Sequence, residues 1–253
     1  MLNKLRNQLL TIIVFILSSS GITLSIYLGI PFFMKYYNLR FGEAYLFCFY
    51  SPFFLLFISN FIIYKIEGHS FSLKSYTSRL RLNKLDKHTI KWLALFFVII
   101  FIGFAITSKL GQLISDNISF FSIPDFLPGG LNHNKKLLPG YFFDIPLSNN
   151  WLFAIFYFIG WFFNIFGEEL MFRGILLPRN EKTFNKYAWL FQGVLWGIWH
   201  VYWFWQFIPL TFFVALPLLY VVQKTKNTWV GIIIHGTLNL IPLIYIIIQI
   251  VRS

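Results

Sequence analysis

The sequence predicts an all-α membrane protein, a polytopic bundle of about seven transmembrane helices within a range of six to eight. Two observations carry this prediction. Hydrophobic residues make up 57% of the 253 residues and charged residues only 12%, about half the share found in soluble proteins. The hydrophobic residues also gather in runs of roughly 20, the length that an α-helix needs to cross a bilayer. We therefore expect a single integral membrane domain over residues 1–253.

Charged and turn-forming residues bound the apolar runs and mark the ends of the spans. The first run is too long for the hydrophobic region of a signal peptide, so we expect a retained helix. The predicted spans are 9–33, 45–64, 90–108, 151–177, 187–206, 208–223 and 228–250. Only residues 207–209 separate the fifth span from the sixth, which predicts either a tight hairpin or one broken membrane segment.

The distribution of basic residues predicts a cytosolic N-terminus. Of the 21 lysines and arginines, 14 lie in segments on the side of the N-terminus, 6 on the other side and Arg173 inside a span. Basic residues concentrate on the cytosolic side of membrane proteins. This rule accounts for most of the formal net charge of +12, so we expect the lipid bilayer and no nucleic acid as a partner.

Two loops are long. Residues 65–89 are basic and carry Leu73, Tyr76 and Leu80 at helical spacing, which favours an amphipathic helix on the anionic inner leaflet. The alternative is a solvated loop that follows the orientation rule. Residues 109–150 are polar and contain Pro and Gly, which predicts an ordered extracytosolic loop, with a partly re-entrant course as an alternative.

Three charged residues lie inside the predicted span 151–177: Glu168, Glu169 and Arg173. A charge at the centre of a membrane helix costs roughly 2.5–3.5 kcal/mol on insertion scales, so the positions point to a function. Glu169 and Arg173 are four residues apart and share a helix face, which predicts an ion pair. Glu168 is then free for chemistry. The alternative is a purely structural charge cluster.

Later spans add His200, His235 and Asn239. Lone histidines in membranes often only join helices by hydrogen bonds. Counted at about 1.5 Å per helical residue, however, Glu168, His200 and His235 reach similar depths, which predicts a common cavity reached from the cytosol. His235 and Asn239, four apart, share a face.

Peptide hydrolysis would use all four groups. Glu168, helped by His200, would take a proton from the attacking water, and His235 with Asn239 would donate hydrogen bonds to the oxyanion. A second chemistry would place zinc on Glu168, His200 and His235. No HExxH sequence supports the metal, so we favour no cofactor. The single cysteine, Cys48, has no nearby base and is expected to be a buried, inert thiol.

These residues resemble the motifs of the CAAX protease and bacteriocin-processing family, also called the CPBP or Abi family, which includes the Ras-converting CAAX endopeptidase. Its EExxxR motif stands as Glu168 to Arg173, and its HxxxN motif as His235 to Asn239. Its FxxxH motif stands as Trp196 to His200, with Trp in place of Phe, and we expect Trp196 to pack beside the histidine. The resemblance covers about residues 155–245, within a core of about 151–250; residues 9–108 are N-terminal helices.

The resemblance implies an intramembrane endopeptidase whose site is open to the cytosol. Glu168 with His200 would activate water, His235 with Asn239 would form the oxyanion hole, and Glu169, Arg173 and Trp196 would support the site. Membership leaves metal dependence open, and we favour the metal-free form. Prokaryotic members of the family are peptide processors or bacteriocin immunity proteins. We therefore expect a membrane-associated or leader-bearing peptide as substrate rather than a prenylated one.

High Phe, Ile, Asn and Lys usage suggests a bacterial plasma membrane as the location. Two other functions remain open. A non-catalytic membrane protein that confers immunity or scaffolds a partner would tolerate loss of Glu168. A transporter or proton relay would use the Glu and His groups as titrating sites, but no inverted repeat or pair of broken helices is visible in the sequence.

Overall fold

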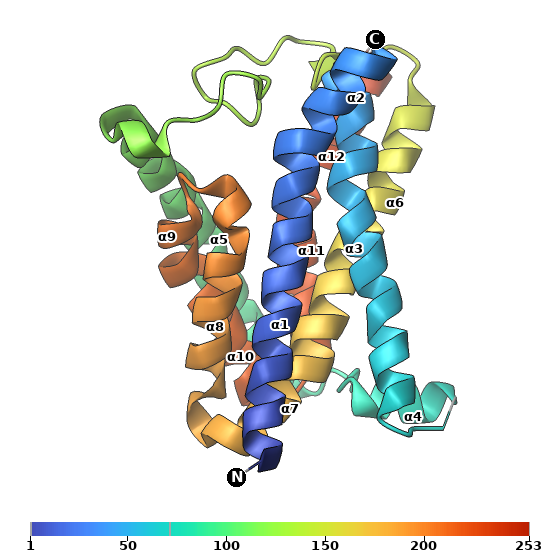
Figure 1. Ribbon diagram of the computed structural model, residues 1–253, viewed down its shortest axis with the longest axis vertical. Helices are drawn as coiled ribbons and strands as arrows, with labels where there is room; N and C mark the ends of the chain where they lie inside the picture. The colour runs from blue at the N-terminus through green and yellow to red at the C-terminus, as the bar shows by residue number, and fades with distance from the viewer. Residues whose placement is uncertain (1, 71, 253) are drawn as a thin grey trace.

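The computed structural model describes residues 2–70 and 72–252, and side chains from residue 8 onward. Lys4 and Arg6, which belong to the orientation count, thus have side chains outside the described part. The all-α prediction is confirmed: the described chain is a bundle of helices with one short sheet (Figure 1). Its N-terminal helical elements are α1 (Leu2–Leu24), η1 (Ser25–Gly29), α2 (Ile30–Tyr37), α3 (Phe41–Ile66), α4 (Leu73–Arg79), α5 (Lys87–Asn117) and η2 (Ser119–Phe121).

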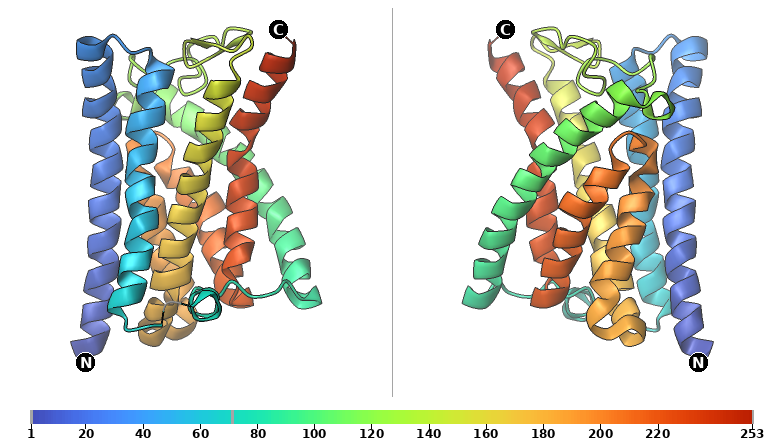
Figure 2. Two further views of the ribbon diagram at one scale, coloured as in Figure 1. Left: turned by 90° about the vertical axis from the view of Figure 1, so that its right-hand side faces the viewer. Right: turned by 90° about the vertical axis from the view of Figure 1, so that its left-hand side faces the viewer.

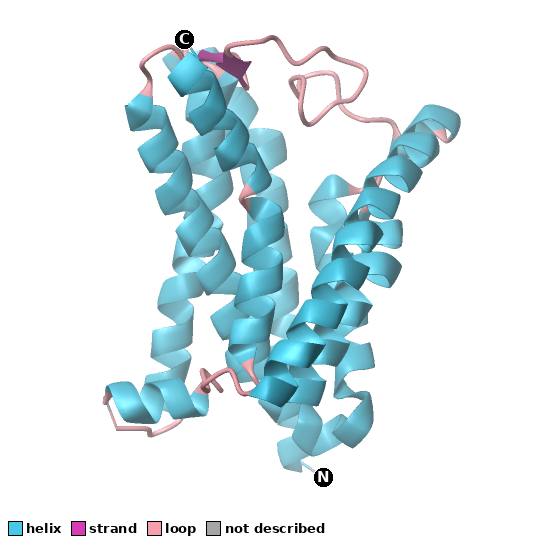
Figure 3. Ribbon diagram, turned by 180° about the vertical axis from the view of Figure 1, so that it is seen from behind, coloured by secondary structure: helices cyan, strands magenta, loops and turns pink. Residues whose placement is uncertain are grey.

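The second half of the chain forms the centre of the bundle. The short strands β1 (Tyr141–Phe142) and β2 (Ile145–Pro146) precede it and pair antiparallel. The helical elements that follow are α6 (Trp151–Glu168), η3 (Glu169–Leu176), α7 (Leu177–Phe184), η4 (Asn185–Tyr187), α8 (Ala188–Trp199), η5 (His200–Trp203), α9 (Phe207–Leu210), η6 (Thr211–Ala215), α10 (Leu216–Thr225), α11 (Thr228–Asn239) and α12 (Ile241–Arg252). Figure 3 shows helices over nearly the whole described chain, with loops gathered at its two ends.

Helices lie where the sequence predicts spans. In the described part, five helical stretches are long and apolar enough to cross a membrane, or up to six with the pair α11 and α12, which is bent by 42°. Pro242 follows this bend, and proline cannot donate the helical hydrogen bond. The longest stretch, Trp151–Trp203, contains two of the predicted spans, because the chain reverses at Asn185, where φ is 49°. The protein is thus an integral membrane protein.

The fifth and sixth predicted spans form a tight hairpin rather than one broken segment. α8 packs against α10 and η6, and η5 with residues 204–206 makes the turn. With 12 residues, α8 is only about 18 Å long, shorter than the roughly 30 Å hydrocarbon core. The tip of this hairpin therefore ends short of the loop end of the bundle (Figure 2), and His200 lies at this tip.

The basic loop contains the predicted helix, α4, but most of its apolar residues face the protein. The Tyr76 ring stacks on Phe61 and its hydroxyl donates to Asn60. Leu80 is fully buried, and only Leu73 is exposed. The helical spacing was therefore read correctly, but packing against the protein and not a lipid surface accounts for two of its three apolar positions. Tyr76 packs against α3, and Leu80 lies against Gly174 of η3.

The second long loop begins later than predicted, because α5 continues to Asn117 and residues 109–117 are helical. Residues 118–150 are ordered and cover one end of the bundle, where the C-terminus also lies (Figure 1). Phe143, at the turn between β1 and β2, accepts a hydrogen bond from the Gly42 N–H at 2.9 Å. Its ring packs against Phe41 and Tyr45, which fixes the loop on the first turn of α3.

Candidate active site

A π-helical segment carries Glu169 and Arg173 and follows directly after Glu168. η3 begins at Glu169, directly after α6 ends at Glu168, and all eight of its residues are buried. π-helical turns inside α-helices are rare and are frequently found at functional sites. The sequence spacing alone predicted a regular α-helix here. The wider turns of η3 set the directions in which Glu169 and Arg173 project from the continuous α6–η3–α7 helix.

Glu168 is held by two hydrogen bonds, one to each carboxylate oxygen. The Asn164 side-chain amide donates to Oε1 at 2.8 Å, and the Trp196 indole N–H donates to Oε2 at 2.9 Å. Glu168 itself is only 1% exposed. Asn164 was not among the predicted site residues, although its position four residues before Glu168 on the same helix is a usable signal. Trp196 does more than pack, because a phenylalanine has no N–H to donate.

Glu169 connects Arg173 to His235. Its Oε1 lies 3.0 Å from His235 Nδ1, and its Oε2 lies 3.3 Å from Arg173 Nε. The predicted ion pair is therefore present, and both of its side chains are fully buried. The three guanidinium nitrogens have no aligned hydrogen-bond acceptor among the described residues, so charge attraction dominates this pair. The guanidinium also stacks on the Trp196 ring, with Cζ 3.9 Å from the ring centre.

The hydrogen bonds of the two histidines define their protonation patterns. His200 Nδ1 lies 2.7 Å from the Trp196 carbonyl oxygen, which can only accept, so Nδ1 carries a proton. In a neutral His200 ring, Nε2 then has a free lone pair. His235 Nδ1 faces a Glu169 carboxylate oxygen and likewise donates. His235 Nε2 is therefore a hydrogen-bond donor only when its ring is positively charged, with Glu169 as the counter-ion.

Asn239 lies one helical turn beyond His235 in α11. Its side-chain amide donates to the His235 backbone carbonyl at 3.1 Å. This bond uses one of the two N–H groups of the amide and fixes its direction. The second N–H stays available for another acceptor.

The four side chains predicted to carry the chemistry line one cavity of about 260 Å³. Glu168, His200, His235 and Asn239 all contribute to its wall, as do Trp196 and Asn164. No hydrogen bond joins Glu168 directly to His200 in the described part of the chain; the Trp196 ring lies beside both histidines, 4.7 Å from the His200 ring and 5.4 Å from the His235 ring. Aromatic residues form much of the remaining wall, including Tyr157, Trp161, Tyr202 and Trp203.

The three residues of the metal alternative, Glu168, His200 and His235, have other partners in this geometry. Among the described residues, no three His, Cys, Asp or Glu side chains are grouped as the ligands of a metal ion would be. Both carboxylate oxygens of Glu168 accept hydrogen bonds, and Nδ1 of His235 donates to Glu169. The trio Glu168, His200 and His235 is thus not arranged as a ligand set, and we derive no catalytic step through a metal.

Trp196→Phe provides a test of how Glu168 is positioned. The change keeps an aromatic ring between the histidines but removes the donor to Oε2. A hydrogen bond to a charged group is worth about 1.5–3 kcal/mol, so we expect kcat for peptide cleavage to fall roughly 10- to 100-fold with KM nearly unchanged. Trp199→Phe is the matched control, since the Trp199 indole donates to Ser18 instead. An equal loss of kcat in both variants would contradict a specific role for Trp196.

Gly231→Ala provides a test of the close approach of α11 to η3. A side-chain carbon at Gly231 would overlap the Glu169 carboxylate, which is buried and bound on both sides. We expect the variant to lose about 1–3 kcal/mol of stability, as overpacked sites do. Gly21→Ala is the control, because no atom lies within 4 Å of a carbon added there. Thermal unfolding in detergent measures both, and equal midpoints would contradict the predicted overlap.

The fold and the cavity define a polytopic helical membrane protein with a carboxylate and two imidazoles at an internal cavity. Residues 150–241 match the family described as type II CAAX prenyl endopeptidase Rce1-like. This segment is similar to the CAAX protease family, which the sequence motifs had also indicated. The match runs from the residue before α6 to the first residue of α12 and includes every predicted site residue. No curated protein and no solved structure matches the chain.

Proposed function

We propose that this protein is an intramembrane endopeptidase in which Glu168 and His200 activate a water molecule without a metal. The observation that carries the proposal is the convergence of Glu168, His200, His235 and Asn239, from three separate helical segments, on one cavity. The family that residues 150–241 match is described as an endopeptidase. Three charged or titratable groups would also be costly at this depth without a use.

In the proposed reaction, water binds between Glu168 and His200. Its oxygen attacks the carbonyl carbon of the substrate peptide bond, and its proton passes to Glu168 or to the free Nε2 of His200. The same proton then goes to the nitrogen of the leaving amine as the C–N bond breaks. Asn164 and Trp196 hold the Glu168 carboxylate during these steps and prevent it from rotating out of line. General base catalysis of this kind contributes roughly 10²–10⁴-fold.

His235 and Asn239 would stabilise the negative oxygen of the tetrahedral intermediate. The Nδ1–H of His235 already donates to Glu169, so a positively charged His235 would donate to the substrate oxygen from Nε2. Asn239 donates the second N–H of its amide. Removal of one such donor costs roughly 10²–10³-fold in kcat in well-studied hydrolases. Glu169 then orients His235 through its contact with Nδ1, and Arg173 balances the charge of Glu169.

The proposed substrates are peptides associated with the membrane, such as leader-bearing peptides, rather than prenylated proteins. The cavity volume of about 260 Å³ is just below the usual 300–1,000 Å³ range of ligand pockets. A farnesylated peptide would need additional room for its hydrocarbon chain. Processing of bacteriocin-like peptides, or immunity to them, in a bacterial plasma membrane fits this substrate class.

Cleavage by the purified protein in proteoliposomes tests the proposal. Two peptide sets are offered, a lipid-anchored library of leader-like sequences and a matching set with farnesylated C-termini, and fragments are identified by mass spectrometry. We expect cleavage of the first set, unchanged by a zinc chelator. Loss of activity with the chelator and its return with zinc would overturn the metal-free mechanism. A folded protein that cleaves neither set would favour the non-catalytic scaffold or immunity function.

A further inference from the structure

The cavity extends from the catalytic side chains toward only one end of the bundle. α6 runs from Trp151, next to the 118–150 loop, to Glu168, and its lining residues all lie at or before Glu168. The α11 and α12 side contributes residues from His235 onward, toward the C-terminus. Four residues of the 118–150 loop complete the wall: Gly130, Leu131, Phe142 and Phe143. The loop and the C-terminus lie together at this end (Figure 2).

Toward the opposite end, packed apolar side chains close the bundle directly beneath Glu168. Met171, Phe172 and Ile175 of η3 are fully buried. The Phe172 ring stacks on Phe15 of α1 with ring centres 4.4 Å apart, and its edge meets Trp199 of α8. None of these η3 residues contributes to the wall of the catalytic cavity.

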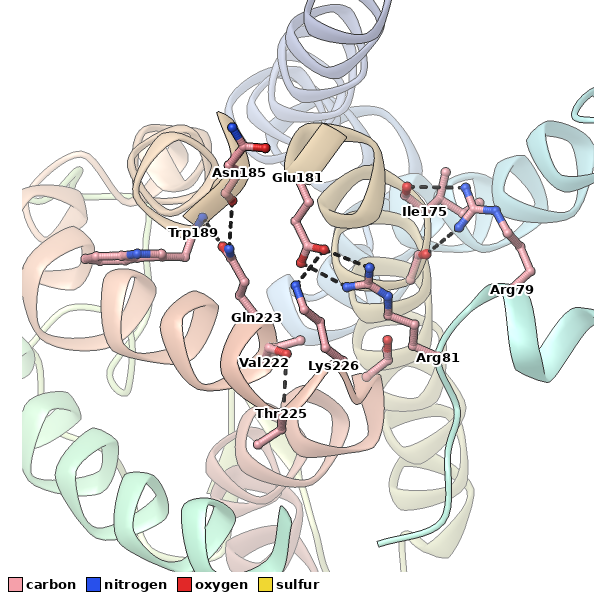
Figure 4. A network of polar contacts seen from close by, with 12 residues as sticks. Arg79, Arg81, Ile175, Glu181, Asn185, Trp189, Val222, Gln223, Thr225 and Lys226 are labelled. Carbon is pink, nitrogen blue, oxygen red and sulfur yellow. Dashed lines mark hydrogen bonds and ion pairs between the residues drawn. The ribbon is translucent and has the colours of Figure 1, made fainter. Parts of the chain in front are cut away.

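A network of polar contacts closes the same end further out (Figure 4). Glu181 of α7 accepts from Arg81 at 2.8 Å and pairs with Lys226 at 2.7 Å. Arg79 donates to the Gly174 carbonyl of η3 at 2.9 Å, and Gln223 accepts from the Trp189 backbone N–H at 2.6 Å. α4, η3, α7, α8 and α10 are thereby joined across this end.

Glu67, just after α3, belongs to this closed end. It pairs with Arg79 at 2.6 Å and with Arg179 at 2.7 Å. Burial alone would raise the pKa of Glu67, but the hydrogen bonds and charges of the two arginines lower it below its usual value. Glu67 therefore stays ionised at neutral pH, and its arginines stay in place.

The closed end is also the basic end. It carries 14 of the 21 lysines and arginines, against 6 at the end with the 118–150 loop. By the positive-inside rule the closed end faces the cytosol. A cytosolic N-terminus and a cytosol-facing cavity, both expected from the sequence, therefore exclude each other in this fold. The first rests on the charge distribution of the chain itself, whereas the second rested on residue counts from the span ends and on the family resemblance.

We infer that the catalytic cavity opens to the extracytosolic side of the membrane and that the enzyme acts on peptides located at the outer leaflet. The peptide substrate in this inference rests on the proposed function. The side of the membrane to which the cavity opens rests on the charge distribution and on the geometry of the cavity. It narrows the substrate class to peptides that have been exported, or that reach the cell from outside, while they are bound to the membrane.

Cysteine labelling tests the direction independently of activity. In a Cys48→Ala background, Asn134→Cys places a thiol on the exposed 118–150 loop and Lys186→Cys places one at the exposed basic end. We expect a membrane-impermeant maleimide to label Asn134→Cys in intact cells and Lys186→Cys only after permeabilisation. The reverse pattern, or labelling of both in intact cells, would overturn the inference.

Cleavage assays then separate this inference from the proposed function. The lipid-anchored leader-like library is added to sealed vesicles of known protein orientation and, in parallel, to the protein in detergent, where both ends are accessible. We expect cleavage in detergent and in vesicles with the loop end outside. Cleavage in detergent and only in vesicles with the basic end outside would overturn the inference and leave the protease proposal standing. Absence of cleavage in detergent as well would overturn the protease proposal and, with it, the substrate class.

Discussion

Glu168→Gln is expected to lower the rate of peptide cleavage by roughly 10²–10⁴-fold, the contribution of a general base. Glutamine has nearly the same shape but cannot take a proton from water. Its oxygen can still accept from either Asn164 or Trp196, while its NH₂ group faces the other donor. A modest loss of stability, about 1–3 kcal/mol for one unsatisfied buried donor, should accompany the loss of activity.

Two measurements keep these effects apart. Initial rates of cleavage in detergent give the activity, and unfolding of the same preparation gives the stability. Glu43→Gln is the matched control, because Glu43 forms an exposed pair with Arg40 on the first turn of α3 and does not line the cavity. It should cleave at the wild-type rate. A Glu168→Gln protein that is folded and retains most of its activity would remove Glu168 from the mechanism.

The helical parts of the site were predictable because they depend on spacing within one helix. Glu169 and Arg173, four residues apart, form the predicted pair, and Glu168 is left free for other partners. Counting residues from the span ends gave depths for Glu168, His200 and His235 that allowed a shared cavity, and the three side chains do line one cavity. Hydrophobic runs located the long apolar helical stretches, including the two predicted spans that form the single stretch Trp151–Trp203.

Contacts between helices were not predictable in this way. The hydrogen bond from Trp196 to Glu168 joins α8 to α6, 28 residues apart, and no periodicity in one helix reports it. The direction of the cavity depends on how the 118–150 loop packs over α3 and on the short hairpin that ends below it. The hydropathy pattern predicts neither feature. It shows only that the loop is polar, and it does not distinguish the short hairpin from two full membrane spans.

The length of α8 shows why a hydrophobic run alone misleads. Its sequence has the hydrophobicity of a membrane span, but its 12 residues end at Trp199, and η5 turns the chain back from His200 onward. Ending the helix there places the His200 imidazole at the wall of the cavity. The family motif FxxxH therefore sits at a helix end, and its tryptophan, one turn earlier, reaches the carboxylate.

Arg173→Met is expected to destabilise the protein by about 3–5 kcal/mol, the cost of breaking a buried ion pair by removing one partner. Methionine fills part of the volume beside Trp196 but leaves the fully buried Glu169 with only His235 as a counter-charge. The guanidinium nitrogens have no aligned acceptor among the described residues, so few hydrogen bonds are lost with the side chain. The loss should therefore come mainly from the uncompensated carboxylate, and unfolding in detergent measures it.

A second variant shows whether charge is the cause. In Glu169→Gln with Arg173→Met the buried charge is gone, and the amide oxygen can still accept from His235 Nδ1, so much of the lost stability should return. Arg40→Met is the matched control: its pair with Glu43 has side chains 49% and 37% exposed, and surface pairs are worth only about 0–1 kcal/mol. If the double variant were no more stable than Arg173→Met alone, packing against Trp196 would be the main role of Arg173. Recovered stability without recovered cleavage would instead assign the pair to catalysis, because the Glu169 carboxylate beside His235 would then be needed for the reaction and not for folding.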